Sequence, residues 1–228
     1  MRRLLLGRLL AVVIGAGSLS AGAGAQAAPP ARASLPSQLR PETRSLLSQL
    51  LDSARVLRIP IAPLTDKAAE GVLKGADDAR VVAAVKSLFR EMALARAIIG
   101  DSASDAFLGA AASTLHAGMT PAELRRIVRP RNGVAADPNV MATALITLVD
   151  FVARRVPLRV ASSAIEELLE RNAGEAQFAT LRSQVEGDIL AGRSPEVSVT
   201  TRLRGQTRIL DTPSPAVPGR RPKPPLDK

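Results

Sequence analysis

The sequence lacks cysteine, tryptophan and tyrosine, and its 228 residues include one histidine and four phenylalanines. Without cysteine there is no thiolate for catalysis and no disulfide to stabilise the fold. A single histidine without cysteine cannot build a zinc site of the usual composition. These absences exclude cysteine-dependent enzymes, disulfide-stabilised scaffolds and the common zinc proteins.

Apolar residues, in contrast, are plentiful, because 46% of the chain is hydrophobic. That supply is enough for a packed domain and argues against a wholly disordered chain. Since disulfides are excluded, the stability of the fold has to come from this core.

Residues 1–27 are typical of a secretory signal peptide. Arg2 and Arg3 precede an apolar run, and residues 25–27 (Ala-Gln-Ala) match the small-x-small cleavage pattern. The most apolar stretch, residues 9–19, is shorter than the roughly 20 residues that a membrane span requires. We therefore expect an exported protein, periplasmic or extracellular, without a transmembrane anchor after cleavage.

Beyond the signal, residues 28–41 are small and Pro-rich and predict a linker. Over residues 42–191 the apolar positions recur at helical spacing, and no strand-like alternation runs between hairpin turns. This pattern predicts an all-α domain of about eight helices, arranged as consecutive helical hairpins in either an irregular solenoid or a compact bundle. The helices are expected to end at or before Pro60, Gly75, Gly100, Gly118, Pro130, Pro157, Asn172 and Gly192.

Two helix starts carry explicit capping signals. Thr120, followed by Pro121 and Glu123, predicts a capping box with proline at the first helical position. Ser102 with Asp105 three residues later predicts the start of the fourth helix.

An internal repeat is suggested by a shift of 96 residues, although two unrelated amphipathic hairpins would align about as well. Shorter spacings of 43 and about 54 residues between the hairpins are unequal. The matched positions are Ile59-Pro60 with Val156-Pro157, Val72 with Leu168, and Val85 with Leu181.

Residues 192–228 form a basic, Pro-rich tail with eight basic and three acidic residues and seven of the 17 prolines. The helical period disappears here, so we expect disorder and no loss of helicity if the tail is deleted. Alternating apolar residues at 197–203 also allow a strand on a partner or an extended arm.

The formal net charge is +10. Clustered arginines make contact with an anionic surface a candidate function, although helix-end charges are more often simply solvated. Specific nucleic-acid binding is not expected, because exposed aromatic residues for base stacking are lacking. The candidate residues are Arg125, Arg126, Arg129, Arg131, Arg202, Arg204, Arg208, Arg220, Arg221 and Lys223.

Catalytic candidates are few. Glu166 and Glu170 share a helix face and could act as a carboxylate pair on glycosides, but there is no Trp or Tyr to stack on a sugar, and Arg171 lies nearby. A solvated acidic face is the favoured interpretation. His116 is expected at a helix end near the surface, and only a pocket that brings carboxylates or a serine to it would favour an enzyme.

The sequence therefore predicts an exported, non-enzymatic helical scaffold or interaction protein without cofactor or metal. Its expected partner is another protein or an anionic component of the cell envelope. One alternative is an envelope tether that acts through the basic tail, and a further alternative is a hydrolase that uses the carboxylate pair. The oligomeric state is left open.

Overall fold

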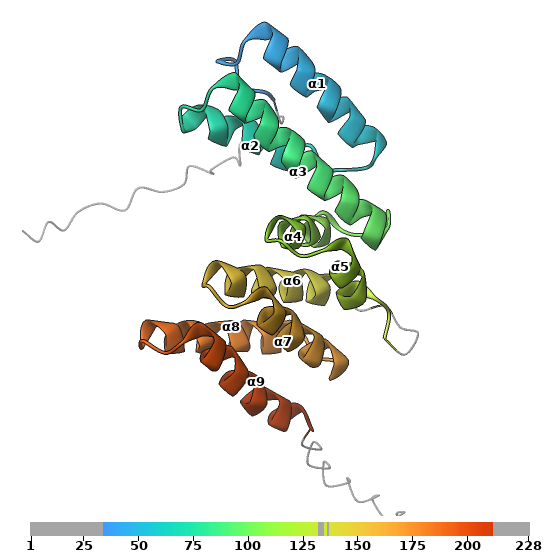
Figure 1. The fold of residues 1–228 in the computed structure, drawn as a ribbon. Helices are drawn as coiled ribbons and strands as arrows, with labels where there is room; N and C mark the ends of the chain where they lie inside the picture. Colours follow the sequence, from blue (N-terminus) through green and yellow to red (C-terminus); the bar gives the residue numbers. More distant parts are fainter. Residues whose placement is uncertain (1–33, 132–134, 136, 212–228) are drawn as a thin grey trace, which may run out of the picture. The chain divides into compact units, whose positions relative to one another are not determined.

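The computed structural model describes residues 34–131, 135 and 137–211, and these form nine helices without a strand. The predicted all-α fold is confirmed (Figure 1). The expected signal peptide and residues 212–228 lie outside the described residues. The helices are α1 (Pro41–Val56), α2 (Ala62–Leu73), α3 (Asp78–Ile99), α4 (Asp105–His116), α5 (Pro121–Val128), α6 (Pro138–Ala153), α7 (Leu158–Glu170), α8 (Glu175–Leu190) and α9 (Pro195–Asp211).

The helices pack as consecutive hairpins. In the hairpins α4–α5, α6–α7 and α8–α9, the first helices pack on one another in order, and so do the second helices. Helices α1 and α3 extend the row of first helices, and α2 packs against α3 (Figure 1). Each hairpin thus contacts its neighbours in the chain, which is the contact pattern of a helical solenoid.

The core lies between the two rows and is almost entirely aliphatic. Phe151 and Phe178 are fully buried, whereas Phe89 and Phe107 are partly buried against the same cluster. All four phenylalanines therefore contribute to the core. Other fully buried large side chains include Leu47, Leu64, Met92, Leu108, Leu124, Ile127, Met141, Leu145, Leu148 and Ile165.

Six of the helices end in the same type of turn. After α1, the N–H of Arg58 donates to the carbonyl of Arg55 (3.0 Å) and the N–H of Ile59 donates to that of Ala54 (2.8 Å). This is the Schellman motif, in which the residue after the C-cap has positive φ. It lets the chain reverse while the last helical carbonyls stay bonded. The positive-φ residues of the six turns are Arg58, Gly75, Gly118, Arg155, Asn172 and Gly192.

The positions of these turns reveal a repeat of 37 residues. Gly118, Arg155 and Gly192 lie 37 residues apart, and the helices α5, α7 and α9 that follow them begin 37 residues apart. Residues 101–211 therefore contain three equivalent hairpins, where the sequence had suggested unequal spacings of 43 and about 54 residues. The predicted shift of 96 residues becomes 97 at the turns, between Arg58 and Arg155.

The end of α3 is built differently. Arg96 is 7% exposed and donates to the carbonyls of Gly100 (3.0 Å), Asp101 (3.3 Å) and Ala103 (3.2 Å), and to that of Arg58 (2.8 Å). One buried guanidinium thus closes the α3–α4 connection and binds it to the α1–α2 turn. This role was not anticipated, because nothing in the local pattern distinguishes Arg96 from a surface arginine.

The predicted disorder of residues 192–228 is wrong for residues 195–211, which form α9, and the alternative strand at 197–203 is wrong too. Val199 and Leu203 are buried while Val197 is 58% exposed, so the i,i+4 spacing determines which side chains enter the core. Two prolines, Pro195 and Pro213, bracket this helix, and the first occupies its N-terminal position.

Two boundaries in the structure also differ from those predicted from the sequence. The linker expected at residues 28–41 ends earlier, because Leu39 is buried and α1 begins at Pro41. The cap of α4 is Ser104 rather than Ser102, and its side chain accepts a hydrogen bond from the N–H of Phe107 (3.3 Å).

Candidate functional site

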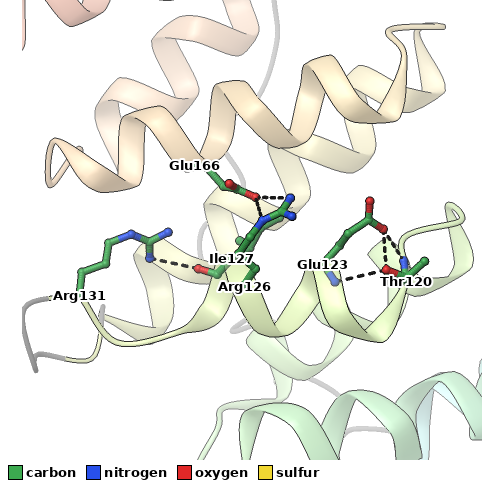
Figure 2. A network of polar contacts seen from close by, with 6 residues as sticks. All are labelled: Thr120, Glu123, Arg126, Ile127, Arg131 and Glu166. Carbon is green, nitrogen blue, oxygen red and sulfur yellow. Dashed lines mark hydrogen bonds and ion pairs between the residues drawn. The ribbon is translucent and has the colours of Figure 1, made fainter.

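The four arginines of the predicted basic cluster at α5 differ in their contacts. Arg125 and Arg129 are exposed. Arg126 pairs with Glu166 on α7 (2.9 Å), and Arg131 donates to the carbonyls of Ile127 (3.0 Å) and Arg129 (3.4 Å), as Figure 2 shows in part. Burial lowers the pKa of Arg131, and the neighbouring charge of Arg129 adds to this effect. Arg126 therefore links α5 to α7, and Arg131 bonds to carbonyls at the C-terminal end of α5.

The capping box at the start of α5 is confirmed. The hydroxyl of Thr120 accepts from the N–H of Glu123 (3.2 Å), and the Glu123 carboxylate accepts from the N–H of Thr120 (2.8 Å; Figure 2). The backbone and hydroxyl donors of Thr120 lower the pKa of Glu123. This box orients α5, and with it Arg126, toward α7.

The basic residues expected in the tail have different environments. Arg202 makes two 2.7 Å bonds to Asp188, which is 5% exposed, and thereby anchors α9 to α8. The side-chain bonds from Arg202 lower the pKa of Asp188, and the same bonds raise that of Arg202. Arg204 and Arg208 are exposed on α9. Arg220, Arg221 and Lys223 lie outside the described residues, so contact with an anionic surface stays a prediction.

The two candidate carboxylates do not converge on a cleft. Glu166 is bonded to Arg126, and Glu170 is exposed beside a shallow hollow that Arg129 and Arg131 also line. Each carboxylate therefore faces arginines instead of a partner carboxylate across a substrate-sized gap, which glycoside hydrolysis needs.

A groove of about 540 Å³ crosses α2, α3, α4 and α6. Its floor combines small and aliphatic side chains, with a few polar groups at the rim. The lining residues on α3 and on α4 follow the i, i+3, i+4 spacing of one helix face. They are Lys67, Ala84, Ser87, Leu88, Glu91, Ala112, Ser113, His116, Ala117 and Val149.

His116 lies in this groove with a carboxylate. Its Nδ1 is 3.0 Å from Oε1 of Glu91, and the hydroxyl of Ser87 donates to the same oxygen (3.3 Å). Ser113 lines the groove one helical turn before His116. The structure thus places serines and a carboxylate around the single histidine, which is the arrangement that would favour an enzyme.

The bonds of the two serines argue against nucleophilic catalysis. Ser113 donates to the carbonyl of Gly109 (2.9 Å) and Ser87 donates to Glu91, so among the described contacts neither hydroxyl is bonded to the imidazole. Both serines also lie inside helices, where backbone N–H groups are bonded four residues back and cannot stabilise an oxyanion. The groove holds a histidine–carboxylate pair without the remaining parts of a catalytic triad.

The groove belongs to a longer face formed by the first helices of the repeats. Asp150, Arg154 and Glu186 lie 37 residues after the lining residues Ser113, Ala117 and Val149. They form the ion pairs Asp150–Arg182 (3.0 Å) and Arg154–Glu186 (2.6 Å) on this face. Next to them Leu190 is 83% exposed. The face therefore changes from apolar over α3 and α4 to charged over α6 and α8.

Comparison with protein-family models, with curated proteins and with solved structures finds no match for this chain. Within the described ranges, no group of three or more His, Asp or Glu side chains could hold a metal ion. No described helix is both long enough and apolar enough to span a membrane.

Proposed function

We propose that the protein is an exported, non-enzymatic scaffold that binds an apolar helical segment of a partner protein in the groove across α2, α3, α4 and α6. The observation that carries this proposal is the groove itself, a largely apolar surface on stacked helices. Solenoids commonly use such faces to bind other proteins.

The lining of the groove favours a helix as its occupant. Ala84, Ala112 and Ala117 keep the floor low, so that the backbone of a second helix can approach closely. Leu88 and Val149 offer aliphatic contacts to side chains spaced at i, i+3, i+4 and i+7, the usual anchors of a helix in a groove.

Polar groups at the rim of the groove can contact the polar side chains of such a bound helix. Lys67 is already paired with Glu70 (2.9 Å), and Glu91 is bonded to His116 (3.0 Å). An amphipathic segment with its apolar side toward the floor matches this arrangement better than a highly charged polymer does.

Photo-crosslinking tests the proposal. A photoreactive amino acid at position 84 points into the groove, whereas the same residue at position 83 is exposed on α3 outside the groove lining. In the native envelope we expect a covalent adduct with one protein at position 84 and none at position 83. Mass spectrometry should map the adduct to an apolar helical segment of that protein.

A substitution in the groove provides a second test of the proposal. Ala84→Arg fills the groove and should abolish the adduct formed from a photoreactive residue at position 117, while Ala83→Arg should leave it unchanged. Equal adducts at positions 83 and 84, or no adduct at position 84 in the native envelope, would contradict the proposal.

A further inference from the structure

Among the described residues, the stack of hairpins ends at α8 and α9, and no described segment covers this end. Equivalent positions of the three repeats show this directly: Ala110 on α4 is 4% exposed and Thr147 on α6 is 1% exposed, whereas Gln184 on α8 is exposed. In the first two hairpins this position is covered by the next first helix, α6 or α8. After α8 the described chain provides no further first helix to cover it.

The uncovered end contains a hollow of about 210 Å³ between α8 and α9, lined without any charged side chain. Ile209 beside it is 74% exposed. Charged residues make up 23% of the chain, and they line each of four further hollows of the described body, including the groove. The lining residues of this end face are Ala176, Gln177, Thr180, Gln184, Gln206, Ile209 and Leu210.

We infer that two copies of the chain pair through this end face, with α8 and α9 of one copy against α8 and α9 of the other. In a two-fold interface each patch meets itself, so a patch with charges of one sign would repel its copy. A patch without charges avoids this repulsion. Glutamine side chains carry both donors and acceptors, so the exposed Gln184 can bond to its own counterpart.

The chain's own C-terminal residues are a poorer cover. Residues 212–228 follow α9 directly, but they contain six prolines and four basic residues, and few aliphatic side chains to fill an apolar hollow. A second copy supplies α8 and α9, whose Ala176, Ile209 and Leu210 offer apolar side chains to the hollow.

Sedimentation equilibrium of the full chain, expressed so that the host can process its leader, tests the inference. At concentrations of about 1 to 100 µM we expect a rise from the mass of one chain to that of two. Ala176→Arg and Thr180→Arg place a charge on the end face and should hold the mass at one chain throughout. Ala179→Arg is the matched control, since Ala179 is exposed on α8 outside the hollow, and it should pair like the wild type.

Three outcomes would overturn the inference. The first is a wild-type chain that stays at the mass of one chain over the whole range. The second is a doubled mass that all three variants retain, which would place the contact elsewhere. The third is pairing that appears only after residues 212–228 are deleted, which would make those residues the cover. The groove variants Ala83→Arg and Ala84→Arg should pair normally, so this result is independent of the proposed partner binding.

Discussion

Individual residues decide where the chain reverses. Three of the six Schellman turns use glycine at the positive-φ position and a fourth uses Asn172, and the sequence pointed to these four residues as helix ends. Arg58 and Arg155 occupy the same conformation, in which an L side chain is strained by about 1 kcal/mol or more. These two turns were predicted from the prolines that follow them, Pro60 and Pro157, and not from the turn residues themselves.

Arg155→Gly should therefore stabilise the protein. Relief of the strained backbone favours the folded state, and the greater freedom of glycine in the unfolded chain offsets part of this, so we expect a gain of about 0.5–1 kcal/mol in the free energy of unfolding. Urea denaturation measures the change. At the equivalent positions Gly118 and Gly192, substitution by alanine should destabilise by at least a similar amount, and a stabilising effect there would contradict this account.

The bond between Asp188 and Arg202 predicts a pH dependence. Because Arg202 lowers the pKa of Asp188, the folded protein binds fewer protons than the unfolded chain between that lowered pKa and the ordinary aspartate value of about 3.9. The stabilisation is complete above the ordinary value and is lost as the pH falls through the lowered one.

Asp188→Asn should consequently destabilise the protein at pH 7, and the difference from the wild type should shrink at about pH 3 and below. Urea unfolding at several pH values measures this. Asp66→Asn, at an exposed position on α2, is the control and should cost little at any pH. A destabilisation by Asp188→Asn that is the same at pH 7 and in strong acid would show that the pair does not act through its charge.

At the scale of elements, the helical conformation of the segments and the positions of most helix ends follow from local signals. Proline at the first helical turn, glycine after the last, and the Thr120–Glu123 box are short-range features whose effect needs no partner element. Helix α9 is the exception. Its buried stripe is short and polar, with Ser198, Gln206 and Thr207 beside two aliphatic residues, so its period is weak until α8 provides a surface to cover it.

Truncation tests the assignment of α9. Removing residues 192–228 should lower the helical circular dichroism signal and the midpoint of thermal unfolding, because α9 is lost together with its packing against α8. Removing residues 212–228 alone should leave both nearly unchanged, since the described helices end at Asp211. Equal spectra for the two truncated chains would mean that α9 is not formed in solution.

At the scale of the whole described body, charges that look like a binding site serve to align hairpins. Arg126 pairs with Glu166 across α5 and α7, and Arg171 pairs with Asp211 across α7 and α9, each over 40 residues of sequence. Contacts between α6 and α8 also keep one spacing, 32 residues, from Thr143–Glu175 to Arg154–Glu186. A constant spacing means that these helices run parallel in a fixed register.

Such pairs explain why the candidate site was only partly predictable. The partners of Arg126, Arg202 and His116 lie on other helices, at separations of 40, 14 and 25 residues, and no local spacing rule connects them. The groove could not be located either, since it combines faces of four helices. The sequence had already limited its chemistry, because a chain with one histidine and no cysteine can place few reactive groups in any groove.

Composition and short-range order were thus sufficient for the helical class and the hairpin connections, because helix formation and capping act over a few residues. Packing alone decided the 37-residue repeat, the ordering of α9, the pairing of the arginines and the position of the groove. Burial and ion pairing join residues that are distant along the chain, and their free energy is gained only once the hairpins stack.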